Sequence, residues 1–270
     1  MLVLDDYRKI LSDSSSKGNQ RKFYVNGNWI KLDNEYCYEG LAEHFVSCFC
    51  YCIEDFPHVQ YISDRFEYRG NIYNGCYSAN MFKDDYSSFI SFRSLFKQYN
   101  IPKNILISDE SISVNIQNTV SAIKQNTGVD LLNYLGRLLM LDCLIINEDR
   151  HIMNLGAEYN GVVDKYFEVP CFDNGSSLFC TNWTYKSRKS LEENIDFAKS
   201  VARPFSKFYD KQLNALLDLG CPKLKINKSS VDYLLKNYSN KYYSDDLIAR
   251  VKYILKNRLD YYEGWCFVYV

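Results

Sequence analysis

One long apolar run limits what this chain can fold into. It reads V-D-L-L-N-Y-L-G-R-L-L-M-L-D-C-L-I-I and spans residues 129–146. Because it is apolar on most faces, we expect a helix that is buried at the centre of a domain. The next residues are N-E-D-R-H-I-M-N, a polar cluster that holds one of only three histidines. The sequence therefore predicts a polar loop that leaves the middle of the core.

The composition is that of a folded protein with no general attraction for polyanions. The 270 residues are 47% apolar and 16% aromatic, which suits one large domain or a two-lobed unit. Lys and Arg number 32 against 33 Asp and Glu, a formal net charge of −1. This balance favours neither nucleic-acid nor membrane binding, and we expect neither.

The N-terminus and the cysteines favour a reducing compartment. M-L-V-L-D-D-Y-R-K lacks the basic start and apolar run of a secretory signal, and no apolar segment is long enough to span a bilayer. The ten cysteines lie in apolar runs such as F-V-S-C-F-C-Y-C-I, where thiols commonly act as small hydrophobes. We expect free thiols in a cytoplasmic protein.

The residue pattern changes along the chain, from β-prone to helical. In R-K-F-Y-V-N-G-N-W-I-K-L two β-prone runs flank Asn26-Gly27, a strong hairpin signal. Apolar residues at helical spacing predict a helix over about 39–52, and short aromatic runs predict strands within 57–92. The remainder reads mainly helical. We predict an α+β fold of two lobes, residues 1–105 and 106–270.

The polar cluster and a second acidic turn are expected to meet. Asn154 lies five positions after Asp149, and the following segment predicts a hairpin that turns at Asn160-Gly161. Such a hairpin would return Asp173, in C-F-D-N-G-S-S-L-F, to the neighbourhood of Asp149. Two carboxylates and an amide would then share one small volume.

These residue types suit phosphoryl transfer with magnesium. Mg²⁺ prefers oxygen ligands, usually one or two carboxylates with phosphate oxygens and water. Asp173 and Asn154 could supply such oxygens, and Asp149 would stay free to accept a hydrogen bond from an attacking hydroxyl. We therefore predict Asn154 and Asp173 as metal ligands and Asp149 as a catalytic residue.

The motifs resemble those of a known family. The spacing from Asp149 to Asn154 is that of the protein-kinase loop H-R-D-x-x-x-x-N, and D-N-G stands in the place of D-F-G. N-E-D-R-H-I-M-N followed by F-D-N-G-S-S-L is similar to the HipA-type serine/threonine kinases, particularly the shorter HipA-like branch with the CtkA proteins. The resemblance covers roughly residues 13–180. It implies a two-lobed kinase fold, with a nucleotide-binding lobe before a catalytic lobe, and an ATP- and Mg²⁺-dependent serine/threonine protein kinase.

The upstream segment W-I-K-L-D…Y-E-G-L-A-E-H resembles the nucleotide lysine and following helix of the same branch. Lys31 is the predicted phosphate lysine, a role in catalysis and nucleotide binding, with Glu39 or Glu43 as its partner. Lys22, on the neighbouring strand, is the alternative lysine. The interval from Lys31 to Glu39 is short for a kinase.

The polar stretch 12–18 stands where a glycine-rich phosphate loop would lie, although it has only one glycine. Backbone N–H groups of such a turn can cradle phosphate. We predict nucleotide contacts from Ser15, Ser16, Lys17 and Gly18. By resemblance, the serines at 14–16 are also candidate autophosphorylation sites.

Three further residues have predicted supporting or catalytic roles. His151 could orient the catalytic loop through a hydrogen bond to the backbone or to Asp173. Arg150 is expected to pair with a nearby carboxylate, and Asp142 is expected to be a satisfied interior carboxylate below the loop.

Other functions stay open on the sequence. D-R-H-x-x-N also resembles the loop of phosphatidylinositol kinases, so a lipid or small-molecule kinase is one alternative. A non-catalytic pseudokinase is another. The family resemblance implies a protein substrate with Ser or Thr, a possible antitoxin-like or regulatory partner, and either cytoplasmic residence or secretion as an effector.

Overall fold

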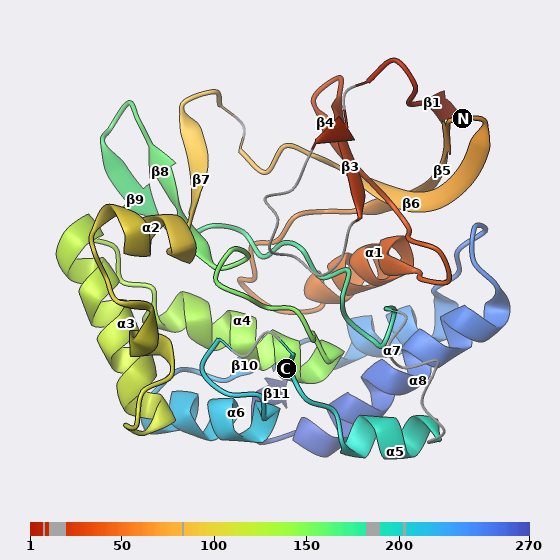
Figure 1. The fold of residues 1–270 in the computed structure, drawn as a ribbon. Coiled ribbons are helices and arrows are strands. Elements are labelled where there is room, and N and C mark those ends of the chain that lie inside the picture. Colours follow the sequence, from red (N-terminus) through yellow and green to blue (C-terminus); the bar gives the residue numbers. More distant parts are fainter. Residues whose placement is uncertain (8, 11–19, 83, 182–189, 202–203) are drawn as a thin grey trace.

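The structure is a computed structural model that describes residues 1–7, 9–10, 20–82, 84–181, 190–201 and 204–270. It has a curled β-sheet in the N-terminal part and a mainly helical C-terminal part (Figure 1), which confirms the predicted α+β class.

The N-terminal sheet has six strands in the order β1-β5-β6-β4-β3-β2. Only β1 and β5 pair in parallel, and the other neighbours are antiparallel. One face of the sheet packs on α1, which fills the space between the sheet and the helical part (Figure 1). The bounds are Leu2–Val3 (β1), Lys9–Ile10 (β2), Arg21–Val25 (β3), Asn28–Leu32 (β4), Ile62–Tyr68 (β5), Asn71–Ala79 (β6) and Glu39–Cys50 (α1).

The predicted hairpin at Asn26-Gly27 is confirmed. Both residues have positive φ, 49° and 80°, as a tight two-residue turn between twisted strands requires. The turn sets the register so that Lys22 lies directly opposite Lys31. Both lysines therefore project from the same face of the sheet.

Helix α1 approaches the sheet very closely at two glycines. A Cβ atom added to Gly75 of β6 would lie 2.2 Å from the backbone oxygen of Lys31, and one added to Gly40 would lie 2.6 Å from the carbonyl carbon of Gly75. Only hydrogen fits at these two positions. The contact brings the start of α1 directly beneath β4 and β6.

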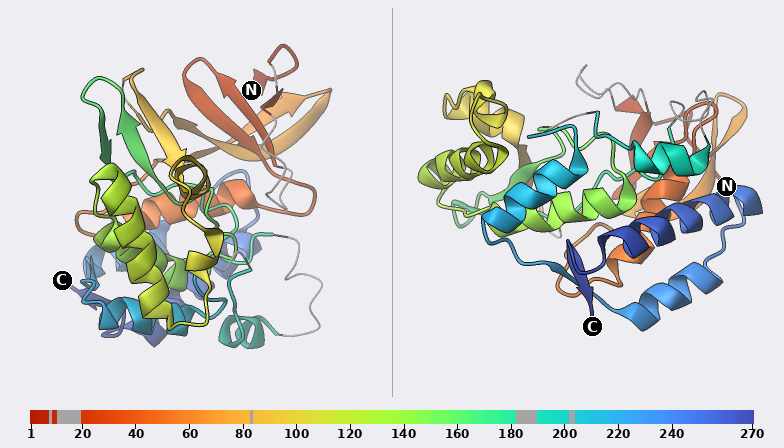
Figure 2. Two further views of the ribbon diagram at one scale, coloured as in Figure 1. Left: turned by 60° about the vertical axis from the view of Figure 1, so that its left-hand side comes forward. Right: turned by 90° about the horizontal axis from the view of Figure 1, so that it is seen from below.

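The helical part surrounds α4, the predicted buried helix. Most residues of α4 are buried, and its neighbours include α6 and α8 (Figures 1 and 2). The helix begins at Leu132, later than the apolar run, because Asp130 accepts a hydrogen bond from the Leu132 N–H and is exposed. The helices are Phe92–Gln98 (α2), Ile112–Thr127 (α3), Leu132–Ile145 (α4), Leu191–Asp196 (α5), Tyr209–Asp218 (α6), Lys228–Asn237 (α7) and Asp245–Tyr262 (α8), with a 3-10 turn at Lys103–Leu106 (η1).

The second predicted hairpin, after the polar cluster, is also present. Strands β8 (Gly156–Asn160) and β9 (Lys165–Phe167) pair antiparallel, and β7 (Ser87–Ser91) pairs with the other edge of β8. Strand β7 precedes the predicted lobe boundary at residue 105 and β8 follows it. One small sheet therefore joins the two regions.

A parallel pair of strands near the C-terminus contacts the residues that follow α1. Strand β10 (Leu224–Ile226) pairs with β11 (Phe267–Tyr269). Next to β10, the Asn227 N–H donates to the Cys52 carbonyl at 2.8 Å, and Glu54 N–H donates to the Lys225 carbonyl at 2.9 Å. Strand β10, paired with β11, thus supports the segment that directly follows α1.

All ten cysteines are free thiols, and eight of them are buried, as the sequence predicts. Burial raises the pKa of most of these thiols, for example that of Cys221 to about 11, so they stay protonated. In the described segments, no helix combines the length and the apolar character that crossing a bilayer requires.

We expect Gly75→Ala to lower the free energy of unfolding by about 2 kcal/mol or more, because the added methyl must displace the β4 backbone. Urea unfolding followed by circular dichroism measures the change. Gly161→Ala is the matched control, since the nearest atom to its Cβ would be 3.7 Å away and little change is expected. Equal stability of the two variants would contradict the close approach of β4 and β6.

Candidate active site

The polar loop after α4 is folded back on itself by a left-handed residue and by two asparagine side chains that bond to its backbone. Helix α4 is followed by Ile146 in a left-handed conformation, φ 51°, and this turns the chain out of the core. The Asn147 side chain then accepts a hydrogen bond from the Asp149 N–H at 3.0 Å. Asn154 Nδ2 donates to the Asp149 carbonyl at 3.2 Å. The amide five positions later is therefore held beside Asp149.

Arg150 is buried and connects this loop to the D-N-G segment. Its guanidinium pairs with Asp142 of α4, with Nη2 at 3.0 Å from Oδ1. It also donates to the Phe172 carbonyl at 2.8 Å and to Asn174 Oδ1 at 2.6 Å. Burial raises the pKa of Asp142, and the charge of Arg150 opposes that rise. Arg150 was predicted to pair with a carboxylate and Asp142 to be a satisfied interior carboxylate, and the structure shows that each is the partner of the other.

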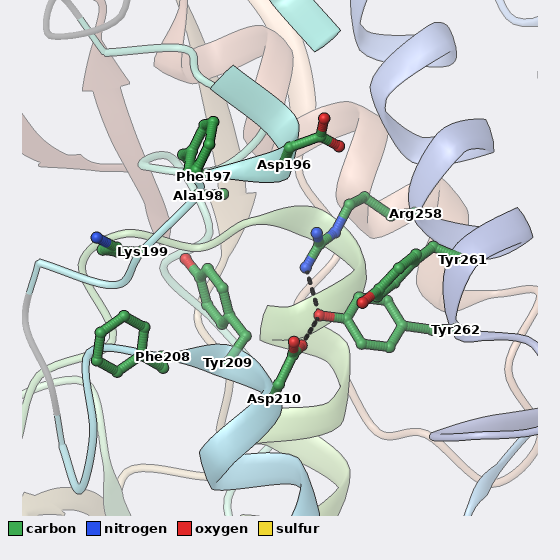
Figure 3. A pocket seen from close by; sticks show the side chains of 10 residues that line it. All are labelled: Asp196, Phe197, Ala198, Lys199, Phe208, Tyr209, Asp210, Arg258, Tyr261 and Tyr262. Carbon is green, nitrogen blue, oxygen red and sulfur yellow. Dashed lines mark hydrogen bonds between the residues drawn. The ribbon is translucent and has the colours of Figure 1, made fainter. Parts of the chain in front are cut away.

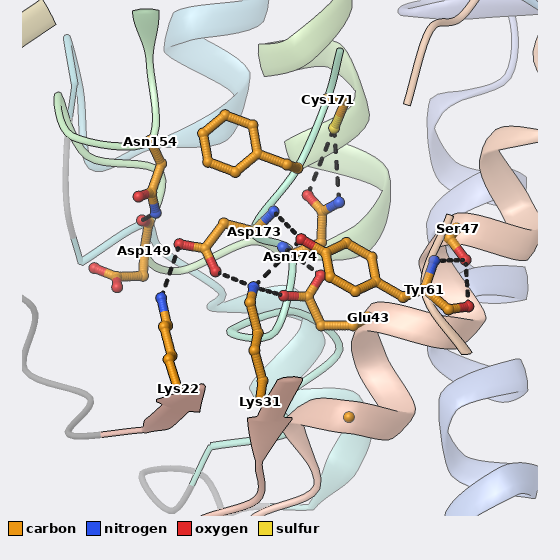
Figure 4. Close-up of polar contacts among 12 residues, drawn as sticks. Lys22, Lys31, Glu43, Ser47, Tyr61, Asp149, Asn154, Cys171, Asp173 and Asn174 are labelled. Carbon is orange, nitrogen blue, oxygen red and sulfur yellow. Dashed lines mark hydrogen bonds and ion pairs between the residues drawn. The ribbon is translucent and has the colours of Figure 1, made fainter. Parts of the chain in front are cut away.

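Lys31 lies between two carboxylates (Figure 4). Its Nζ contacts Glu43 Oε1 and lies 2.6 Å from Asp173 Oδ1. Glu43 is fully buried, and its second oxygen accepts the Asn174 N–H at 2.8 Å. Burial alone would lower the pKa of Lys31, but Asp173 and Glu43 outweigh it and hold that pKa well above its usual value. Lys31 is therefore a fixed ammonium group.

Of the two candidate glutamates, Glu43 is the one that contacts Lys31. Glu39, the residue named first from the sequence, accepts hydrogen bonds from the backbone and side chain of Asn34 at 3.2 and 2.8 Å. It lies at the first position of α1, and Glu43 follows one turn later, beneath β4. The pairing with Lys31 is corrected to Glu43. Glu39 still lines the polar cavity described below.

Asp173 points into the same volume as Asp149 and Asn154. It has a left-handed backbone, φ 58°, which aspartate tolerates better than most residues and which is common at functional sites. A polar cavity of about 60 Å³ is lined by Asp149, Asn154 and Asp173, together with Lys22 and Glu39. Figure 4 shows the three side chains side by side. The two loops therefore meet as the sequence predicts.

The ionised form of the Asp173 carboxyl group is strongly favoured. Burial opposes its ionisation, but Lys22 and Lys31 outweigh burial and hold the pKa of Asp173 far below its usual range. Lys22 is the more distant lysine, with Nζ 3.9 Å from Asp173 Oδ2, while Lys31 lies 2.6 Å from Oδ1. Both lysine candidates thus lie at the site.

A second, apolar cavity adjoins the polar one. It has a volume of about 170 Å³, and Lys22, Lys31 and Asp173 form its polar end. Apolar and aromatic walls with a few polar groups at one end are typical of small-molecule sites. The walls of this cavity are Trp29, Val59, Tyr61, Ala79, Met81 and Phe172.

His151 does not make the hydrogen bond expected for it. Within the described residues, neither ring nitrogen has a hydrogen-bond partner, and Nε2 lies 3.8 Å from Asp149 Oδ2. Its backbone N–H helps to hold the loop, since it donates to the Asp149 carbonyl at 2.9 Å. The predicted contact with Asp173 was wrong, because the imidazole lies beside Asp149 instead.

Tyr61 is a site residue that sequence reasoning missed. Its hydroxyl lies 3.4 Å from Lys31 Nζ and accepts from the Asp173 N–H at 3.4 Å. Its ring centroid is 4.8 Å from the same ammonium, within the range of a cation–π contact. One tyrosine among 24 carries no motif that could have identified it.

The donor set at the polar cavity fits a hard divalent cation that is also bound by phosphate and water. Asp173 offers a carboxylate and Asn154 an amide oxygen, which are ligands that Mg²⁺ prefers. In the part of the chain that is described, no group of three or more His, Cys, Asp or Glu side chains could enclose a metal. The predicted nucleotide contacts Ser15, Ser16, Lys17 and Gly18 lie outside the described residues.

Comparison with known proteins supports the fold. No protein-family model matches the chain, and no curated protein does. Among solved structures, the proinflammatory kinase CtkA of Helicobacter pylori is similar with a TM-score of 0.61 and 16% identity, over 96% of this chain and 94% of CtkA. HipA of Shewanella oneidensis, solved with HipB and its operator DNA, is similar with a TM-score of 0.51 and 16% identity, over 97% of this chain and 67% of HipA. The chain therefore has the fold of the HipA-like kinases.

We expect Arg150→Met to lower the free energy of unfolding by about 3–5 kcal/mol, because it leaves the carboxylate of Asp142 buried without its cation. Arg137→Met is the matched control. Its partner Glu168 is exposed, so a loss below about 1 kcal/mol is expected. Chemical denaturation measures both values, and equal losses would contradict the role assigned to Arg150.

Glu148 gives the stability a pH dependence. Burial, with a smaller effect from Asp149, raises its pKa to about 7. The folded state then favours the protonated acid, so its contribution to stability is present at low pH and is lost as the pH rises through about 7.

Glu148→Gln removes this titration. As the pH rises from about 5 to about 8, we expect the melting temperature of the parent protein to fall relative to that of the variant. Glu110→Gln, at an exposed position, should change the pH profile little. If the two variants have the same profile, the buried acid is not at position 148.

Proposed function

We propose that the protein is an ATP- and Mg²⁺-dependent protein kinase that phosphorylates serine or threonine. The observation that carries the proposal is the meeting of Lys31, Asp149, Asn154 and Asp173 at two adjoining cavities, one polar and one apolar. The similarity in fold to CtkA and HipA supports it. In this proposal, residues 1–105 form the nucleotide lobe and residues 106–270 the catalytic lobe.

The apolar cavity would receive the base of the nucleotide, with its phosphates directed to the polar end. Lys31, fixed by Glu43, would bind phosphate oxygens, and Lys22 would add a second positive charge nearby. A fixed ammonium stabilises the charge that develops on the transferred group and needs little rearrangement during the reaction.

Asp149 would accept the proton of the attacking hydroxyl. The substrate oxygen then forms its bond to the terminal phosphorus while the bond to the leaving diphosphate oxygen breaks. Burial, and then the nearby charge of Asp173, raises the pKa of Asp149, which makes it a better proton acceptor than an ordinary carboxylate. Asn154 and Asp173 would hold Mg²⁺, which neutralises phosphate charge when it is bound.

The proposal extends to the serines at 14–16 as autophosphorylation sites and to a protein as the substrate. An antitoxin-like or regulatory protein is the proposed partner. The HipA neighbour was solved with HipB and DNA, whereas the near-zero net charge of this chain argues against a direct nucleic-acid contact.

Labelled ATP with Mg²⁺ tests the proposal. We expect label on a serine of residues 12–16, and we expect Asp149→Asn and Asp173→Asn each to reduce labelling by about a hundredfold or more. Asp130→Asn, at an exposed aspartate that pairs with Lys124, should retain full labelling. Phosphosite mapping by mass spectrometry locates the label.

The same assay separates the other functions. Label in phosphoinositides, with none in protein, would identify a lipid kinase. Labelling of neither protein nor lipid, together with no rise in melting temperature on adding ATP and Mg²⁺, would identify a non-catalytic binding module and overturn the proposal.

A further inference from the structure

A separate cavity of about 300 Å³ lies between α5, α6 and α8 (Figure 3). Aromatic rings form much of its wall, including Phe197, Phe208, Tyr209 and Tyr261. None of these residues lines the candidate active site. A concave, ring-lined space of this size suits a small planar molecule.

A buried cation reaches into this cavity. Arg258 is only 5% exposed, and Figure 3 shows its guanidinium directed towards the centre of the ring-lined space. Its Nε donates to the Cys143 carbonyl and its Nη2 to the Tyr262 hydroxyl, both at 2.9 Å. In the described part of the chain no carboxylate pairs directly with Arg258, and the nearest link to one runs through the Tyr262 hydroxyl, which donates to Asp210. A buried charge with only neutral hydrogen-bond partners favours an anionic ligand.

Further positive charge surrounds the mouth. The ammonium groups of Lys199, Lys207 and Lys211 each lie 5.0–5.2 Å from the centre of the Phe208 ring. The lining also contains two carboxylates. Asp210 already accepts a hydrogen bond from Tyr262 at 2.5 Å, and the other, Asp196, is exposed to solvent. The lining itself has two cations, Lys199 and Arg258, and two carboxylates, and Lys207 and Lys211 beside the Phe208 ring add positive charge just outside it.

We infer that this cavity is a binding site for a small aromatic anion, such as an arene carboxylate or sulfonate. The anionic group would contact Arg258 and the lysines at the mouth, and the ring would stack against the aromatic wall. This inference does not depend on the proposed kinase activity.

The cavity is linked to the polar loop. The Tyr209 hydroxyl donates to the Asn147 carbonyl at 2.7 Å, and Arg258 donates to Cys143 near the end of α4. Two lining side chains therefore hold the backbone from which Asp149 projects. A ligand that moves either side chain would change the position of that loop.

The probe is 8-anilinonaphthalene-1-sulfonate, a fluorescent aromatic anion, titrated into the full chain. Ala198→Trp fills the cavity and should weaken dye binding by about tenfold or more. Ala79→Trp is the matched control, because Ala79 lines the apolar cavity of the candidate active site. It should leave dye binding within about twofold.

Charge is tested separately, at exposed positions. Lys199→Gln combined with Lys207→Gln should weaken dye binding about threefold or more, whereas Lys228→Gln combined with Lys256→Gln should not. Naphthalene-1-sulfonate should displace the dye better than neutral 1-naphthol. Unchanged binding in folded Ala198→Trp, a larger loss in Ala79→Trp, or equal displacement by the neutral compound would each overturn the inference.

Discussion

The candidate active site depends on one buried guanidinium. Arg150, in the loop after α4, contacts Asp142 in the core helix and both the Phe172 backbone and the Asn174 side chain in the D-N-G turn, so one group joins three segments. A charge in the interior is tolerated only when its partners are complete, and here they are supplied by the core helix and the D-N-G turn. The distance between Asp149 and the D-N-G turn is consequently set by the core of the protein and not by the loops alone.

A second junction joins the sheet to the same turn. Glu43 contacts Lys31 with one oxygen and accepts the Asn174 N–H with the other, so a rotation of α1 would break both contacts together. The glycine contact between α1 and β6 resists such a rotation, because Gly40 of α1 lies directly against the backbone of Gly75 with no free space between them. Asn174 is common to both junctions. The site is therefore held as one unit from two directions.

Much of this arrangement was predictable because it rests on local signals. The buried helix, both Asn-Gly hairpins and the meeting of Asp149 with Asp173 follow from periodicity, turn chemistry and spacing. The choice between Glu39 and Glu43 could not be made from the sequence, because the two residues are four positions apart on one face of the same helix. Only the packing of α1 on the sheet selects between them. The contact of Tyr61 with Lys31 is likewise made between distant segments, which leave no mark on the nearby sequence.

The parallel pairing of β10 with β11 affects the order in which the protein can be completed during synthesis. Strand β10 supports the residues after α1, yet its partner, Phe267–Tyr269, is made more than forty positions later. While the ribosome still holds that last strand, β10 has an open edge and the end of α1 lacks its full support. Helix α1, which carries Glu43, therefore reaches its final stability only after translation has passed Tyr269.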